Sequence, residues 1–235
     1  MGINKVRKSV KTTAPSLQYE RVLWQQGVKG IVGIDEVGKG AWAGPLTVVA
    51  AVIPQDKRIY KVRDSKLLKE DERESLYSRI SEWCKSWSVG HASNDECDEL
   101  GMSGAQKLAV QRAIEGLSIK GDHFLIDGKW DFVGHLVGVD NVTKIIKGDT
   151  KCLSIASASV LAKVTRDRMM RDFHMQFSQY KFDDNKGYPS PYHIEALNNF
   201  GPCDIHRKSW AFMDQLTSHG IPRLRRPSAQ GTLFS

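Results

Sequence analysis

Acidic residues stand where apolar segments of this sequence give way to glycine. The best-defined pair, Asp35 and Glu36, ends a β-branched run and opens into a turn punctuated by Gly38 and Gly40. A carboxylate at the end of a buried strand is costly unless it meets a cation or a metal ion. Because successive strand side chains point to opposite faces, the pair can converge on one ligand only where the strand bends, and glycine permits such a bend. The sequence therefore predicts acid held at a strand end.

Two further aspartates occupy the same position after other apolar runs. Asp127 follows the run 123–126, and Asp149 follows the run 142–146. Taken singly, each also fits an ordinary turn, in which Asp and Gly are common. In an open sheet with helices on its faces, however, the ends of adjacent strands form the usual crevice for a ligand. Acid after three apolar runs therefore favours one shared site.

Carboxylates gathered in this way call for divalent cations. A like-charged pair about 4 Å apart costs about 4 kcal/mol at an effective dielectric of about 20, and a bound cation reverses that penalty. Oxygen ligands select hard metals, and no histidine has an H-E-x-x-H spacing, so Mg²⁺ or Mn²⁺ is expected rather than Zn²⁺. Two such ions suit in-line phosphoryl displacement, which together with a basic chain points to a nuclease.

The elements that must position these acids alternate between strand and helix patterns. β-branched apolar runs predict strands, and the first two, separated by a glycine-proline turn, are expected to pair as a hairpin or meander. Apolar residues at helical spacing predict the helices. The predicted strands are Gly30–Ile34, Leu46–Ile53, His123–Ile126 and Val142–Ile146. The predicted helices are Glu70–Trp83, Ala105–Leu117, Ser154 to beyond Arg168, His193–Asn199 and Trp210–Thr217.

Composition sets the class of protein. The chain has 235 residues, 40% hydrophobic and 26% charged, which suits one large globular domain. Its apolar runs are too short to span a membrane, and no apolar signal region follows the basic start, so a cytoplasmic protein is expected. Four cysteines without C-x-x-C spacing predict reduced thiols and argue against a structural zinc site.

The charge balance favours an anionic partner. The formal net charge is +7, from 34 Lys and Arg against 27 Asp and Glu. Nucleic acid is the first candidate and an acidic membrane surface the second. Charge by itself leaves open a basic protein that binds no polyanion.

The motifs around the acidic residues resemble, in order, the successive signatures of type 2 ribonuclease H, ribonuclease HII. The resemblance spans about Tyr19 to Met213, and the combination is far more specific than any single motif. The motifs are Gly33–Gly40, Ala43–Pro45, Asp64–Lys66, Asp98–Gly101, Ile126–Gly128, Lys147–Asp149, Ser157–Asp167, Lys186–Tyr188 and Ile205–Arg207.

The resemblance implies roles for particular residues. The four acids match the family's metal-binding tetrad, which would hold two cations at the scissile phosphate. Gly38, Lys39 and Gly40 match a glycine-arginine-glycine loop whose backbone reads the 2′-hydroxyl of a ribonucleotide. Lys39 departs from the usual arginine and cannot make a planar bidentate contact, whereas backbone readout by the glycines survives the change. Tyr188 would stack on the nucleotide beside the ribose, and Lys66 would contact backbone phosphate.

Simpler interpretations compete at the less distinctive positions. Lys39 and Lys66, taken alone, fit solvated surface charges, and Tyr188 fits a core or rim aromatic. Asp167 lies among opposite charges in a helical segment and is better explained by a local ion-pair network than by metal binding. His206 is expected to have a structural, hydrogen-bonding role.

The expected fold is a ribonuclease H-like mixed β-sheet flanked by helices, an α/β fold with a helical C-terminal region. The implied activity is hydrolysis of the RNA strand of RNA–DNA hybrids and nicking 5′ of single ribonucleotides embedded in duplex DNA, leaving 3′-hydroxyl and 5′-phosphate ends. One alternative is ribonuclease HIII, whose extra N-terminal domain has no room before Gly30. Another is a catalytically silent hybrid-binding protein, against which the intact set of four acids argues.

The predicted organisation is a single catalytic domain between two extensions. Residues 1–28 form a partly flexible N-terminal extension, 29–218 the catalytic domain and 219–235 a flexible tail. The segment Gln230–Phe234 resembles the short peptides that dock on replication sliding clamps, although a plain disordered tail also explains it. A monomer with no membrane partner is expected.

Overall fold

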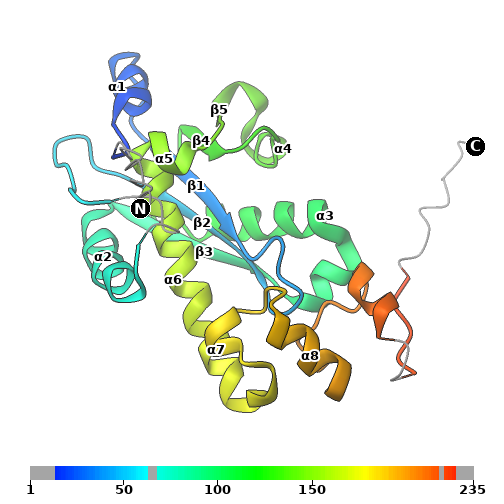
Figure 1. The fold of residues 1–235 in the computed structure, drawn as a ribbon. Coiled ribbons are helices and arrows are strands. Elements are labelled where there is room, and N and C mark those ends of the chain that lie inside the picture. The colour runs from blue at the N-terminus through cyan, green and yellow to red at the C-terminus, as the bar shows by residue number, and fades with distance from the viewer. Residues whose placement is uncertain (1–13, 63–67, 217–219, 226–235) are drawn as a thin grey trace, which may run out of the picture.

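A mixed sheet of five strands forms the centre of the molecule (Figure 1). The computed structural model describes residues 14–62, 68–216 and 220–225. The strand order is β3-β2-β1-β4-β5, with β1 antiparallel to β2, β2 antiparallel to β3, and the neighbours β1, β4 and β5 parallel. The strands are β1 Ile31–Val37, β2 Leu46–Val52, β3 Ser86–Ala92, β4 His123–Asp127 and β5 Val142–Ile145.

Helices cover both faces of this sheet. The larger α-helices are α1 Gln18–Gln25, α2 Glu70–Trp83, α3 Asn94–Glu115, α6 Leu153–Gln176 and α8 Pro191–Phe200. The short elements are α4 Gly134–Val137, η2 Val139–Asn141, α5 Gly148–Lys151, η3 Ser178–Tyr180, α7 Phe182–Asn185 and η4 Ala211–Gln215. Alternate residues of β2 divide between two cores: Val49 packs with α2 and α6, whereas Val48 packs with α3. The sheet is therefore the middle of three layers.

The long helix α6 approaches β1 very closely. A Cβ atom at Gly33 would lie 2.2 Å from the backbone of Ser154, so only glycine fits where the strand passes the start of α6. Helix α1 is held at the same point, because the backbone N–H of Ser154 donates to the buried Glu20 carboxylate (2.9 Å). α6 then runs beyond the sheet into the C-terminal region (Figure 1).

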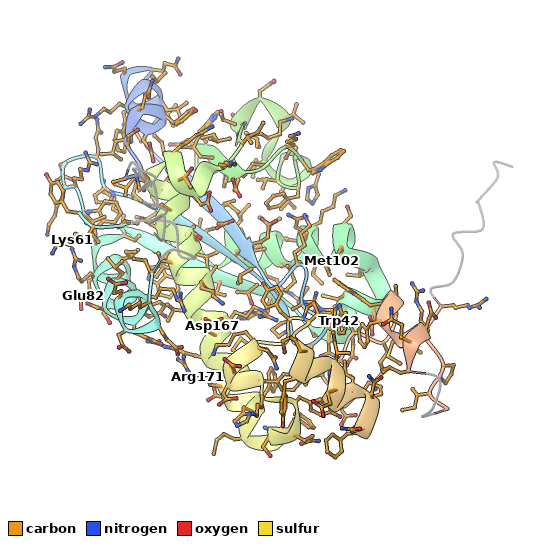
Figure 2. All side chains as sticks on the ribbon, viewed as in Figure 1. Trp42, Lys61, Glu82, Met102, Asp167 and Arg171 are labelled. Atoms are coloured by element: carbon orange, nitrogen blue, oxygen red, sulfur yellow. The ribbon has the colours of Figure 1, made fainter. Side chains whose placement is uncertain are left out.

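The C-terminal region packs against the loop 38–45 that joins β1 to β2. Trp42 projects from this loop towards the C-terminal helices (Figure 2), and its ring stacks on Phe212 at a centroid distance of 4.5 Å. Ala43 belongs to the same apolar cluster. The loop is therefore fixed between the sheet and the C-terminal region.

The predicted mixed α/β architecture is confirmed, including the hairpin of β1 and β2. The sequence prediction lacked β3, the helix α1 and the first turns of α3, a helix that is kinked at Gly101, where φ is 69°. In the described part of the predicted helix Trp210–Thr217, the chain forms the shorter 3-10 helix Ala211–Gln215 instead of an α-helix. Among the described residues, no helix has both the length and the apolar character needed to cross a bilayer.

Candidate active site

Asp35 and Glu36 lie near the C-terminal end of β1, where the strand leaves the core. The Asp35 side chain is buried, with 8% relative exposure, and its Oδ1 accepts the backbone N–H of Glu36 (2.8 Å). Burial raises the pKa of Asp35 well above its ordinary value, and the neighbouring Glu36 and Asp127 charges raise it further. A hydrogen bond from Ser159 of α6 lowers the pKa and so favours the ionised carboxylate.

The parallel pairing of β1 with β4 brings a third acid to this edge. Ile34 pairs with Ile126, so the residues that follow them, Asp35 and Asp127, lie at the same end of adjacent strands. The negative charge of Asp127 also contributes to the raised pKa of Asp35.

Asp149 reaches the same edge through its neighbour in the chain. The backbone N–H of Gly148 donates to Asp127 Oδ1 at 2.6 Å, and Asp149 follows in the first turn of α5 with 6% relative exposure. The structure thus brings Asp35, Glu36 and Asp127 together and ties the segment bearing Asp149 to them. Within the described ranges, no three acidic, histidine or cysteine side chains form a group already arranged to hold a metal ion.

We call this edge of the sheet, with Asp35, Glu36, Asp127 and Asp149, the acidic edge. Its chemistry fits a hard divalent cation. Its side chains supply oxygen donors, which Mg²⁺ and Mn²⁺ prefer. Burial, followed by the neighbouring Glu36 and Asp127 charges, raises the pKa of Asp35, and a bound cation would favour its ionised form. One positive group is already close, since Lys39 Nζ lies 3.6 Å from Glu36 Oε1.

The two glycines beside the acidic edge have different structural requirements. Gly38 has φ +88°, and a Cβ there would lie 2.3 Å from Arg166 Nε, so the fold itself demands glycine. At Gly40 a Cβ would meet nothing closer than the Tyr188 ring, at 3.9 Å. Packing within the protein therefore does not explain glycine at position 40.

The exposed tip of the loop offers backbone donors. Lys39 and Gly40 are exposed, whereas Gly38 and Ala41 on either side are buried. In the part of the chain that the structure describes, the N–H groups of Lys39 and Gly40 have no hydrogen-bond partner. Two adjacent unpaired N–H groups can bind an anion or a hydroxyl oxygen.

Sequence comparison identifies the family to which this site belongs. The profile described as Ribonuclease HII matches residues 32–213. A ribonuclease HII from Streptomyces avermitilis is 45% identical over 190 residues, which cover 81% of this chain and 80% of that relative. This chain belongs to the ribonuclease HII family.

Solved structures agree with the assignment to ribonuclease HII. The ribonuclease H2 from Pyrococcus horikoshii OT3 superposes with a TM-score of 0.68 at 27% identity, covering 81% of this chain and 98% of that one. The ribonuclease HII from Archaeoglobus fulgidus, solved in a complex with PCNA, gives a TM-score of 0.66 at 25% identity, covering 79% and 96%. The chain is therefore a ribonuclease H enzyme, an endonuclease of RNA–DNA hybrids.

The loop 38–45, called the glycine loop, lies beside Tyr188 of this ribonuclease HII. The Tyr188 hydroxyl oxygen accepts the backbone N–H of Gly38 (3.0 Å), and the Arg166 guanidinium lies 5.4 Å from the centre of the half-buried tyrosine ring. Nucleotide stacking by Tyr188 stays a prediction. The predicted phosphate contact Lys66 lies outside the described residues.

Two structural roles expected from the sequence are confirmed in this ribonuclease HII. Asp167, labelled on α6 in Figure 2, pairs with Lys163 (2.7 Å) and lies 3.9 Å from Arg73. His206 is buried, with its Nε2 3.0 Å from His193 Nε2 and its Nδ1 accepting the N–H of Cys203 (2.9 Å).

Sequence reasoning missed several residues that support the ribonuclease HII site. Ser159 of α6 hydrogen-bonds Asp35, a contact that the sequence analysis does not predict. A small polar residue on a sheet-facing helix surface is the signal that could have identified it. Arg166 and Arg207 lie inside matching motifs, but nothing in their spacing indicates that they are buried.

Proposed function

We propose that this ribonuclease HII cleaves RNA strands of RNA–DNA hybrids, nicks duplex DNA 5′ of a single embedded ribonucleotide, and does so with two divalent cations. The four acids, Asp35, Glu36, Asp127 and Asp149, are the proposed ligands. The single observation that carries this proposal is the buried, like-charged group at the ends of β1 and β4, which raises the pKa of Asp35.

Each supporting contact prepares the acids for cations. The Ser159 hydrogen bond favours ionised Asp35, and the Gly148 N–H fixes one oxygen of Asp127, leaving its other oxygen available. When bound, Mg²⁺ or Mn²⁺ would lower the pKa of water and stabilise the leaving oxygen.

The adjacent loop supplies the proposed selectivity for ribonucleotides. The unpaired N–H groups of Lys39 and Gly40 can donate to the 2′-hydroxyl oxygen, which distinguishes RNA from DNA at a given sugar. The absence of a side chain at Gly40 lets the ribose approach the backbone. Tyr188, held to this loop through Gly38, is the proposed stacking platform.

The decisive assay compares three end-labelled duplexes: all-DNA, DNA with one ribonucleotide, and an RNA–DNA hybrid. Each is incubated with Mg²⁺ or Mn²⁺ and, in parallel, with chelator. We expect cation-dependent cleavage of the second and third substrates, with a 3′-hydroxyl on the upstream product. Cutting of the all-DNA duplex would contradict hydroxyl readout, and cutting in chelator would contradict cation catalysis. Tight hybrid binding without any cleavage would favour the silent hybrid-binding protein.

We also propose that the segment Gln230–Phe234 docks on a sliding clamp. The support is its peptide pattern and the fact that the Archaeoglobus fulgidus ribonuclease HII was solved in a complex with PCNA. The segment lies outside the described residues. Surface plasmon resonance should show clamp binding that disappears in the double variant Leu233→Ala/Phe234→Ala and persists in the control Ser228→Ala. Equal binding by both variants would refute this partner.

A further inference from the structure

The largest fully buried side chains of the described molecule are two arginines. Arg166 of α6 and Arg207, which precedes η4, both have 0% relative exposure. Burying a guanidinium is costly unless its charge and its N–H groups are compensated. Their hydrogen-bond partners therefore show what the molecule gains from them.

Arg166 bonds backbone on two sides of the glycine loop. Its Nε donates to the carbonyl of Pro45 (2.9 Å) and its Nη2 to that of Ala43 (2.9 Å). Its Nη1 donates to the carbonyl of Lys186 (2.8 Å), in the segment that leads to Tyr188. One side chain thus links the end of the loop to the tyrosine segment.

Arg207 bonds the same loop nearer its tip. Its Nε and Nη2 both donate to the carbonyl of Gly44, at 3.1 and 3.0 Å. Its Nη1 donates to the carbonyl of Lys39 at 3.3 Å. The planar guanidinium therefore spans two loop carbonyls, which a lysine ammonium cannot do from a fixed fork of donors.

Within the described ranges, neither guanidinium forms an ion pair with a carboxylate. Asp167, which acts on Arg166 electrostatically, is bonded to Lys163 at 2.7 Å. Asp98, which acts on Arg207, accepts backbone N–H groups instead, including that of Ser209 at 3.0 Å. Burial lowers the pKa of Arg166 to about 10, so it remains charged at neutral pH. The two cations are satisfied mainly by loop carbonyls.

The Lys39 carbonyl bond has a direct consequence for the neighbouring amide. The carbonyl of Lys39 and the N–H of Gly40 belong to one planar trans peptide group, so they point in opposite directions. Because Arg207 holds that carbonyl towards the interior, the Gly40 N–H is directed outwards, where it has no partner among the described residues.

We propose that Arg166 and Arg207, together called the arginine floor, are positioning residues that aim the Gly40 N–H at the ribonucleotide 2′-hydroxyl. This inference rests on the proposed function, because it assigns a cause to the hydroxyl readout by the loop. The arginine floor touches no substrate and acts through the orientation of one peptide group.

The test measures binding in chelator, so that cleavage does not contribute. Affinities of full-length protein for a one-ribonucleotide duplex and for the matching all-DNA duplex are compared by fluorescence anisotropy. Arg207→Lys keeps the charge but loses the planar fork. It should reduce the ratio of the two affinities about tenfold, the loss expected for one hydrogen bond, with all-DNA affinity unchanged. Arg166→Lys should reduce the ratio in the same direction.

The control is Arg168→Lys, an exposed α6 residue paired with Glu74, which should leave the ratio unchanged. An unchanged ratio in folded Arg207→Lys would overturn the proposal. An equal loss of affinity for both duplexes would also overturn it, because it would indicate a general structural role. If wild-type protein itself showed no preference and no cleavage, the proposed function would fail instead.

Amide NMR of the wild-type chain keeps the proposal testable if neither lysine variant folds. The Gly40 amide resonance should shift on addition of the one-ribonucleotide duplex and not on addition of all-DNA duplex. The Arg207 Nε–H should stay protected from solvent exchange in both titrations. Identical Gly40 shifts with the two duplexes, or a rapidly exchanging Arg207 Nε–H, would refute the positioning role.

Discussion

The acidic edge and the arginine floor are neighbouring charged regions with opposite states of compensation. At the acidic edge, Asp35 is buried beside the like charges of Glu36 and Asp127, and its pKa is raised. In the arginine floor, the buried guanidiniums donate hydrogen bonds to loop and Lys186 carbonyls. Repulsion between the carboxylates of the first region can be relieved by a bound cation. The guanidiniums of the second region are already hydrogen-bonded to carbonyls, and these bonds fix the backbone of the loop.

This difference separates residues that bind from residues that position. Carboxylates that repel one another are stabilised by a bound cation, so substituting one should abolish cleavage while leaving the fold intact. Guanidiniums that already donate to carbonyls are not stabilised further by a ligand, so substituting one should first change the conformation of the loop backbone. The variants below test this distinction at successively smaller effects.

The largest expected effect is the loss of cleavage in Asp35→Asn. Removing one ligand charge should lower kcat/KM with Mg²⁺ about a thousandfold, equivalent to roughly 4 kcal/mol. Initial rates on the one-ribonucleotide duplex measure this loss. The matched control Asp172→Asn, at an exposed position of α6, should cleave at the wild-type rate. Comparable activity in Asp35→Asn would remove this acid from the catalytic site.

Without cations, Asp35→Asn should raise the free energy of unfolding at neutral pH, although it lowers activity. A carboxyl whose pKa is raised by folding costs stability as pH rises through that raised value, so the contribution of Asp35 to the free energy of unfolding of metal-free protein should decline from acid to neutral pH, opposite in sign to the contribution of the buried histidines. Asp35→Asn should remove this dependence. Mg²⁺ at about a hundred times its Kd should raise the wild-type free energy of unfolding by about 3 kcal/mol.

Chemical denaturation with and without chelator measures both effects. Asp172→Asn is again the control and should respond to Mg²⁺ as wild-type protein does. A cation response that is undiminished in Asp35→Asn would place the binding site elsewhere.

Alanine substitutions at Gly38 and Gly40 should have smaller effects than Asp35→Asn. Gly38→Ala should lower mainly stability, and Gly40→Ala should lower mainly activity. Gly38→Ala combines a positive φ with a clash against Arg166, so it should lower the free energy of unfolding by about 1–3 kcal/mol. Gly40→Ala has open space and should cost less than about 0.5 kcal/mol. It should nevertheless lower kcat/KM on the one-ribonucleotide duplex about tenfold, because the added methyl group stands where the ribose must approach.

Thermal unfolding and initial rates on the two variants check this pair of expectations. If Gly40→Ala were the less stable variant, the loop would be shaped by forces other than those described. If it cleaved normally, hydroxyl readout by this backbone would be wrong.

The sequence predicted the acidic edge because its information is local. An apolar run precedes each of Asp35, Asp127 and Asp149. The parallel pairing of β1 with β4 then places Asp35 and Asp127 at the same end of the sheet. The arginine floor depends on contacts between distant positions: Arg166 and Pro45 are 121 positions apart, and Arg207 and Gly44 are 163 apart. No periodicity encodes such contacts, so the burial of these arginines emerges only in the folded chain.

The missed strand β3 has a related physical explanation. It lies at the edge of the sheet, and Ser88 and His91 are only partly buried, which weakens the apolar signal on which strand prediction depends. Pairing with the continuously apolar β2 stabilises this weak segment as a strand. Tertiary context thus overrides local propensity at β3 but agrees with it at β1.

The smallest expected effect concerns the pH response of His206, which lies next to Arg207 in the chain. Burial, reinforced by His193, lowers the pKa of His206 to about 3, so it stays neutral in the folded protein. The unfolded chain takes up that proton below a pH of about 6.5. A depressed folded pKa gives stability that is present above pH 6.5 or so and lost as pH falls towards the folded value.

The free energy of unfolding in chelator should therefore fall by about 1 kcal/mol between pH 7 and 5.5 for His206 alone, and the lowered pKa of His193 adds to the slope. His206→Gln should reduce the slope, since glutamine can still accept the Cys203 N–H without titrating. His135→Gln, at an exposed position of α4, should leave the slope unchanged. Equal slopes in wild-type and His206→Gln protein would mean that burial beside His193 does not lower the pKa of His206 in the folded protein.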